Sequence, residues 1–331
     1  MAEKGIKADM NRIRLEEHIP LSTPMRVIID PSSVCNFRCQ YCPHGNEQAL
    51  KTMPQAIMPL ELAMKCIDDL TVFPQRIKKL LFAQIGEPLL NQDLPKIVAY
   101  AFEHKVAECL CITTNASVLT PGLSEQLIAA GISRFDISLY GLNSETYKNF
   151  CGQSIDFDAL YKNISHLYSI RGDAQIAVKI SDAVCKTEQE QNEFYRLFSP
   201  VCDTVCLEHV VPIWYDLGKF TEDDGVDIYG NAAVRKEVCP IPFYTMVVQA
   251  NGIVVPCAND WNENLIMGDV HKESLFSIWN GSKFTRLRID LLKNGCTAIS
   301  PCNRCKAHEL CAVDNIDSYR NELLKRLEDI K

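Results

Sequence analysis

Three thiols lie within one short loop, in the stretch Cys35-Asn36-Phe37-Arg38-Cys39-Gln40-Tyr41-Cys42, which is spaced C-x3-C-x2-C. Thiolates are soft ligands that suit zinc, copper(I) and iron–sulfur clusters. A structural zinc site needs a fourth ligand, usually from a second C-x2-C or a His pair. His44 is the nearby candidate, and it follows Cys42 too closely to complete a relaxed tetrahedron easily. The stretch therefore favours a cluster with one corner free of protein ligands, with a zinc site or coincidental thiols as alternatives.

The cysteine stretch directly follows an apolar, β-branched run, Met25-Arg26-Val27-Ile28-Ile29-Asp30, which predicts a strand. A loop at the carboxyl end of a first barrel strand is where α/β barrels place their chemistry. The motif and its position resemble those of the radical S-adenosylmethionine (radical SAM) enzymes. The resemblance implies that Cys35, Cys39 and Cys42 hold a 4Fe-4S cluster whose fourth iron binds SAM, and that Tyr41 packs near the adenine.

Length, charge and cysteine content limit the class of protein. The 331 residues can bury a substantial core, and a net charge of -8 argues against broad nucleic-acid binding. The first residues lack the apolar core of a secretory signal, and no run approaches the roughly 18 apolar residues of a membrane span. Sixteen cysteines without such a signal do not suit a disulfide framework. We therefore expect a cytoplasmic protein with reduced thiols and no membrane partner.

Predicted strands and helices alternate after the cysteine stretch. Apolar runs that predict strands lie at residues 80–85, 109–113, 135–139, 176–180 and 205–211. Helical patterns lie at residues 59–70, 93–105, 121–130, 144–150, 157–170 and 187–198. With the first strand this gives six β–α units, which predict an α/β fold with a parallel sheet and helices on its outer face. Six units are too few for the closed eight-stranded barrel, so we expect an open, partial (β/α)6 barrel, the core that the resemblance also implies.

The chain is expected to divide near residue 225, because aspartates and glycines crowd residues 216–230 in the manner of a linker or surface loop. Short strand-like pieces, turns and cysteines follow, and residues 318–331 form an amphipathic helical pattern. Residues 43–58 are expected to be irregular. The expected parts are a polar lead-in over residues 1–24, the barrel over 25–225 and a smaller, cysteine-rich α+β domain over 226–331.

Short polar motifs follow several predicted strands. Gly86-Glu87-Pro88 resembles the family's glycine–glutamate motif, whose backbone meets the amino group of SAM, although Ile85 replaces the usual first glycine. Thr113-Thr114-Asn115 resembles the family's T-T-N-G segment, with Ala116 in place of glycine. Residues such as Ser and Asn in these places also suit simple turns and helix caps. The cofactor-binding residues expected on this basis are Tyr41, Gly86, Glu87, Asn115, Ser138 and Lys179.

Titratable residues that could act as a general base lie at and after the end of the sixth predicted strand. Glu208 and His209 end that strand, and Tyr215 follows shortly after. A titratable pair at a barrel mouth is a candidate base, although a charged pair there also suits a solvated rim. We expect the base among these three residues.

A second set of cysteines follows residue 238. Cys239 and Cys257 flank a predicted hairpin, whose strands at residues 245–249 and 253–255 are joined by an Asn-Gly turn. Cys302 and Cys305 then form a C-x2-C pair. Four thiolates can enclose either a zinc ion or a 4Fe-4S cluster, and ligand type alone does not separate the two.

This segment resembles the auxiliary-cluster extension called SPASM, or its shortened twitch form. A full SPASM domain continues C-x2-C-x5-C-x3-C; Cys311 fills the x5 position, but Asn315 stands where the next cysteine belongs. Two clusters would need eight ligands, and only six cysteines are available here. The resemblance therefore implies one auxiliary 4Fe-4S cluster on Cys239, Cys257, Cys302 and Cys305. Cys296 and Cys311 are spare, or one of them substitutes as a ligand.

The resemblance implies SAM cleavage to a 5′-deoxyadenosyl radical that abstracts hydrogen from substrate. The twitch form resembles that of a dehydrogenase acting on an amino-cyclitol, so we expect oxidation of an alcohol on a sugar, cyclitol or aminoglycoside-like molecule. The expected electron donor is a flavodoxin or ferredoxin. Alternatives are a peptide maturase, a dehydratase or an epimerase of the same superfamily, and a non-catalytic cluster or zinc scaffold. In an epimerase, Cys151, Cys296 or Cys311 would return hydrogen to the substrate radical.

Overall fold

Six parallel strands form the centre of the fold, as the sequence predicts. The computed structural model describes residues 2–5, 13–215, 217 and 223–329. The central strands are β2 (Arg26–Ile29), β3 (Ile77–Phe82), β4 (Ala107–Thr114), β5 (Arg134–Leu139), β6 (Gln175–Ser181) and β7 (Thr204–Glu208). Each pairs in parallel with the next along the chain, so their carboxyl ends meet at one rim. The predicted partial barrel is confirmed.

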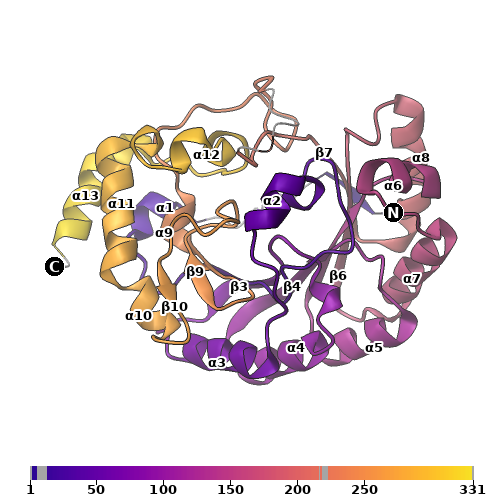
Figure 1. The fold of residues 1–331 in the computed structure, drawn as a ribbon, viewed down its shortest axis with the longest axis horizontal. Coiled ribbons are helices and arrows are strands. Elements are labelled where there is room, and N and C mark those ends of the chain that lie inside the picture. The colour runs from indigo at the N-terminus through magenta and orange to yellow at the C-terminus, as the bar shows by residue number, and fades with distance from the viewer. Residues whose placement is uncertain (1, 6–12, 216, 218–222, 330–331) are drawn as a thin grey trace.

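Helices cover the outer face of this sheet (Figure 1). They are α3 (Leu60–Thr71), α4 (Leu94–Glu103), α5 (Pro121–Ala129), α6 (Ser144–Cys151), α7 (Phe157–Ile170) and α8 (Glu188–Phe198). Local sequence sets where they begin. Thr120 caps α5 ahead of Pro121, and Thr187 and Glu190 form a reciprocal capping box on α8.

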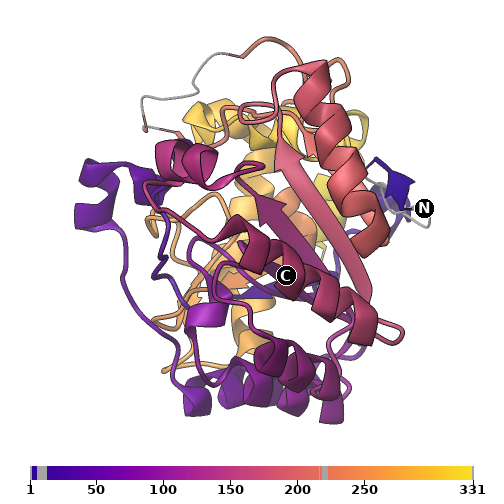
Figure 2. The same ribbon diagram turned by 90° about the vertical axis from the view of Figure 1, so that its right-hand side faces the viewer.

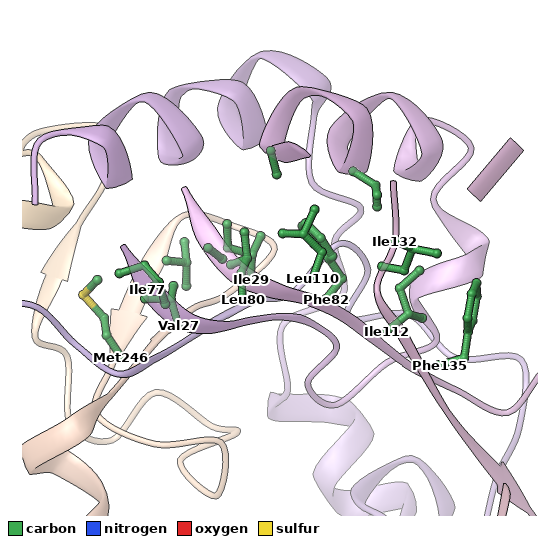
Figure 3. Close-up of a cluster of buried hydrophobic side chains, with 14 of the residues drawn as sticks. Val27, Ile29, Ile77, Leu80, Phe82, Leu110, Ile112, Ile132, Phe135 and Met246 are labelled. Carbon is green, nitrogen blue, oxygen red and sulfur yellow. The ribbon is translucent and has the colours of Figure 1, made fainter. Parts of the chain in front are cut away.

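Apolar side chains pack between the strands and the outer helices (Figure 3). Val27, Leu80 and Ile112 are fully buried there. Burying each such side chain contributes about 1.5–3 kcal/mol. The strands therefore direct bulky residues outward, and their carboxyl ends are left to carry polar residues.

The lead-in and the segment after the cysteines are more ordered than the sequence suggested. β1 (Glu3–Lys4) pairs in parallel with β7 at the edge of the sheet (Figure 2), and α1 (Leu15–His18) follows. The expectation that residues 43–58 are irregular is wrong, because α2 (Glu47–Thr52) forms there. The Asn46 side chain caps that helix by accepting from the backbone N–H groups of Gln48 and Ala49.

The second part of the chain extends the same sheet. β8 (Thr245–Val248) pairs in parallel with β2, and β9 (Ile253–Val255) and β10 (Gly268–Asp269) continue by antiparallel pairing. The predicted hairpin is confirmed, but its union with the barrel sheet was not foreseen. The remaining helices are α9 (Ile241–Tyr244), α10 (Leu275–Trp279), α11 (Ser282–Asn294), α12 (Ala307–Leu310) and α13 (Arg320–Glu328). Short 3-10 turns occupy η1 (Pro43–Gly45), η2 (Pro88–Leu90), η3 (Ser199–Val201), η4 (Cys296–Ala298), η5 (Cys302–Arg304) and η6 (Asp317–Tyr319).

The predicted C-terminal helix corresponds to α13, which buries Leu323 and Leu327. Ile330, expected on the same face, lies outside the described residues, as does most of residues 216–222. No helix in the described part of the chain is both long and apolar enough to cross a membrane.

Candidate active site

The cysteine loop opens onto a cavity at the carboxyl rim of the strands. This cavity has a volume of about 160 Å³, and its lining includes the three thiols of Cys35, Cys39 and Cys42. Gly86 and Asn115 also line it, from the loops after β3 and β4. The structure thus gathers residues from three neighbouring strand ends around the thiols.

Gly86 holds the cysteine loop in place by close contact with it. A Cβ added at Gly86 would lie 1.9 Å from the Ser32 carbonyl oxygen and 2.6 Å from that of Val34. The next residue, Glu87, donates its backbone N–H to the Val34 oxygen at 2.9 Å. Only glycine allows this approach between the loop after β3 and the residues leading into Cys35.

Glu87 joins the loops after β3 and β4. Its carboxylate accepts from the Thr114 hydroxyl at 2.6 Å and from the Asn115 backbone N–H at 2.8 Å. Burial raises the pKa of Glu87 to about 7. Ala116, which stands where the family has glycine, has a φ of 55°, in the left-handed region that glycine adopts without strain. Glu87 lines the cavity, and Ala116 directly follows the lining residue Asn115.

The chemistry of the cavity suits a bound cluster. Burial, above all, raises the pKa of the Cys35 thiol to about 12 and that of Cys42 above its usual range, so three thiolates here require positive charge between them. Within the described residues, no three His, Cys, Asp or Glu side chains converge on a single ion. A cluster gives each thiolate its own iron and so accepts ligands that stand further apart. The donors therefore fit the cluster better than a lone zinc ion.

His44 adds an independent sign that a group fills this cavity. It is 1% exposed and lines the cavity, and neither ring nitrogen makes a hydrogen bond within the described residues. The Ser33 carbonyl influences the ring electrostatically, without hydrogen-bond geometry. A buried polar group left without a partner costs about 1–3 kcal/mol, so a ligand that pairs with it stabilises the site.

A second cavity adjoins the first and has a volume of about 230 Å³. Tyr41, Ser138 and Tyr140 line both cavities. Lys179 and Glu208 line the second cavity and form an ion pair at 3.1 Å. Each of the six residues expected to bind cofactor therefore lies at one or both cavities.

His209 also lines the second cavity, but carboxylates hold its ring on both sides. Nδ1 is 2.5 Å from Asp182, and Nε2 is 3.2 Å from Asp224. Burial lowers the pKa of His209, but the hydrogen bonds and charges of the two aspartates outweigh it and leave the pKa raised. With both ring nitrogens held by carboxylates, His209 is a poor proton acceptor. Asp182 was not singled out from the sequence, although it directly follows β6.

Tyr215, the third candidate base, lies elsewhere. Its hydroxyl is 3.4 Å from Asp260 and accepts from Asn264 at 3.2 Å. Burial, followed by the charges of Asp260 and of Cys257, raises the pKa of Tyr215 well above its usual range. Among the described residues that line the two cavities, Tyr215 is absent. The structure therefore brings Glu208 and His209 to the barrel mouth and places Tyr215 beside the second set of cysteines.

The second set of cysteines comes together around α9 and η5. Cys239, Cys257 and Cys305 all pack against a small apolar cluster around Ile241, and Cys302 begins η5, which Cys305 follows. Burial is the main cause that raises the pKa of the Cys257 thiol to about 12, and the charge of Cys305 adds to it. Cys296 belongs to the same group, because its contact with Cys239 is the main cause that lowers its pKa. His308 contributes in the same direction and was missed in the sequence. Its position shortly after the C-x2-C pair is the sequence signal that could have identified it.

Two family models match these two regions. The model of the radical SAM superfamily matches residues 29–180, which include the cysteine loop and its cavity. Residues 29–180 form a radical SAM domain. The model of SPASM, an iron–sulfur cluster-binding domain, matches residues 239–306, which include Cys239, Cys257, Cys302 and Cys305. The radical SAM domain binds SAM and a 4Fe-4S cluster, and the SPASM domain binds auxiliary iron–sulfur clusters.

Two curated relatives differ in how much of their own length this chain covers. The SAM-dependent 2-deoxy-scyllo-inosamine dehydrogenase of Niallia circulans is 24% identical over 84% of this chain and 90% of its own length. The AdoMet-dependent heme synthase of Methanosarcina barkeri is 27% identical over 51% of this chain, which spans only 45% of that relative. A match over less than half of that relative does not carry its activity to this chain.

Solved structures share the fold. BtrN in complex with AdoMet and 2-DOIA has a TM-score of 0.53 at 21% identity, covering 85% of this chain and 91% of BtrN. SuiB of Streptococcus suis bound to the precursor peptide SuiA has a TM-score of 0.64 at 16% identity, covering 92% of this chain and 74% of SuiB. At these identities the likeness is one of fold.

Replacing Cys302 by alanine is expected to remove the auxiliary cluster, about half of the iron of the reconstituted radical SAM enzyme, and to destabilise the C-terminal part. Cys311→Ala serves as the matched control and is expected to remove less. Iron and sulfide analysis after anaerobic reconstitution measures both. A larger loss of iron from the Cys311 variant than from the Cys302 variant contradicts the ligand set Cys239, Cys257, Cys302 and Cys305.

Proposed function

We propose that this radical SAM enzyme is a dehydrogenase that oxidises an alcohol on a small polyhydroxylated substrate, such as a sugar, a cyclitol or an aminoglycoside-like molecule. The observation that carries the proposal is the second cavity, about 230 Å³ in volume. It is smaller than the roughly 300–1,000 Å³ pockets of drug-sized ligands. Tyr41 and Ser138, on the wall shared with the first cavity, would hold part of SAM, so the remaining space suits one small ring. Lys179 and Glu208 supply charged groups that can hydrogen-bond several hydroxyls.

Bound SAM and its cluster supply hydrogen-atom abstraction from the carbinol carbon, and the auxiliary cluster supplies a one-electron acceptor. The chain's own residues must hold the substrate and remove the hydroxyl proton. Glu208 is the candidate for the proton, because its carboxylate lines the cavity and neither Tyr215 nor the doubly bonded His209 is suited to accept it. Lys179 orients that carboxylate through their 3.1 Å contact.

The printed name of the Niallia circulans relative supports an alcohol on an amino-cyclitol as the substrate class. A peptide maturase is the second candidate, and the fold shared with peptide-bound SuiB favours it. The small volume of the second cavity favours the small polyhydroxylated substrate.

We further propose a flavodoxin or ferredoxin as the electron donor and the cytoplasm as the location. The location is in keeping with sixteen cysteines, none of which is in a disulfide.

Substrate deuterated at the carbinol carbon tests the reaction. A dehydrogenase is expected to yield deuterated 5′-deoxyadenosine and a ketone, with SAM consumed in proportion to product. Candidate sugars and cyclitols are incubated with reduced, reconstituted enzyme, and products are read by mass spectrometry. Solvent deuterium at that carbon without net oxidation establishes an epimerase instead. Turnover of a precursor peptide, with no oxidation of small alcohols, establishes the maturase.

Glu208→Gln is expected to lower turnover by roughly 10²–10⁴-fold, the contribution of a positioned general base, while SAM binding persists. Glutamine keeps the shape of the side chain but cannot accept the proton. Glu108→Gln is the matched control. Glu108 on β4 also pairs with a lysine, Lys78 on β3, but both side chains are exposed. Turnover is measured with the substrate found above, and SAM affinity by calorimetry. Unchanged turnover in the Glu208 variant removes Glu208 from the role of base.

A further inference from the structure

A thiol outside the cluster motif lies against one of the cluster cysteines. Cys151, the last residue of α6, has its Sγ 3.5 Å from the Sγ of Cys39. The two residues are 112 positions apart in the sequence. Cys151 is 0% exposed. It also lines neither of the two described cavities, so it is not placed to return hydrogen to a substrate radical.

Backbone contacts fix the position of Cys151. The N–H groups on either side of Cys39 both donate to the end of α6: that of Arg38 to the Cys151 carbonyl at 2.8 Å, and that of Gln40 to the Phe150 carbonyl at 3.1 Å. The helix then stops at Gly152, which has a φ of 69°. The cysteine loop and the end of α6 therefore form one unit, in which the two sulfurs face each other.

Tyr140 lies close to the same unit. It lines the cavity that Cys39 also lines. It contacts Phe150 with ring centroids 6.4 Å apart, next to Cys151 on α6. An aromatic side chain of the cavity wall therefore packs against the end of α6 that carries Cys151.

We propose that Cys151 is a positioning residue that tunes the SAM-binding cluster by donating its S–H to the Cys39 thiolate. A thiolate bound to iron carries no proton, so the proton between these sulfurs belongs to Cys151. A hydrogen bond to a cluster sulfur stabilises the reduced cluster, which carries more negative charge, and so raises the reduction potential. The cluster gains one electron from a flavodoxin, a ferredoxin or dithionite. No bond breaks, and the proton stays on Cys151.

The test compares reduction potentials of reconstituted full-length variants. Cys151→Ala removes the donor, Cys151→Ser keeps one, and Cys66→Ala removes a buried thiol on α3 as the control. Titration followed by electron paramagnetic resonance reports the cluster whose signal changes on adding SAM. At a fixed potential, the alanine variant is expected to show a several-fold lower ratio of reduced to oxidised cluster, where a tenfold change equals about 59 mV. The serine variant is expected to lie nearer to the wild type.

An unchanged midpoint in Cys151→Ala, with full iron content, overturns the proposal. An equal shift in Cys66→Ala also overturns it, because the effect would then be a general response to a lost core thiol. If the alanine variant fails to hold iron, Cys151→Val replaces it, since valine fills the space without a proton donor. A valine midpoint below that of serine supports the proposal, and equal midpoints overturn it.

Discussion

Alanine at Cys35, Cys39 and Cys42 together is expected to abolish SAM cleavage and to remove about four of roughly eight irons per chain. The three thiols line one cavity, and burial raises the pKa of Cys35 and Cys42, so their thiolates depend on bound positive charge. The auxiliary cluster should persist, because its cysteines lie on other elements. Iron analysis and detection of 5′-deoxyadenosine after reduction measure the two effects.

Cys66→Ala is the control for this experiment, because it removes a buried thiol that lies on α3, outside the cysteine loop. It is expected to keep both iron and SAM cleavage. Stoichiometric zinc in the wild-type protein, with no iron–sulfur chromophore, would contradict the assignment of the cysteine loop to a cluster.

Gly86→Ala is expected to have the second largest effect, a loss of stability of about 1–3 kcal/mol or more together with weakened SAM binding. The added Cβ would meet three backbone atoms of Ser32, Ser33 and Val34, all within 2.7 Å. Backbone cannot rotate away as a side chain can, so the loop that carries Cys35 must move. Denaturant unfolding measures the free energy, and calorimetry measures SAM affinity.

Gly122→Ala provides the matched control, because a Cβ there meets nothing within 4 Å and the residue lies in α5. Alanine is the better helix former, so this variant is expected to gain up to about 1 kcal/mol. A Gly86→Ala protein as stable as the wild type, with the same SAM affinity, would show that the contact with Ser32–Val34 is dispensable.

The barrel could be predicted from the sequence because its signals are local. Each strand is an apolar run, and several helices carry their own caps, as Thr120 and Thr187 show. The second strand was expected at residues 80–85 and lies at Ile77–Phe82, since Ile77 alone marks its start among charged residues. Gly86 consequently follows β3 after a short loop and not directly.

Contacts between distant segments could not be predicted. Nothing local in Glu3–Lys4 marks it as a partner of β7, and nothing in Thr245–Val248 reveals that its neighbour is β2. The same holds within the site. The sequence suggested Cys296 as a spare thiol or substitute ligand, and both Cys296 and Cys151 as hydrogen donors in an epimerase. Their places beside Cys239 and Cys39 depend on how whole elements dock.

The pairing of β8 with β2 has a consequence for any attempt to divide the chain. The two strands are joined over Arg26–Ile29 and Thr245–Val248, although more than two hundred residues separate them. A fragment ending near residue 225 would uncover the N–H and C=O groups of β2 along an open, apolar edge. Such edges recruit other chains, so the isolated barrel is expected to aggregate and not to survive as an independent module. The hairpin beside the auxiliary cysteines therefore also covers the open edge of β2.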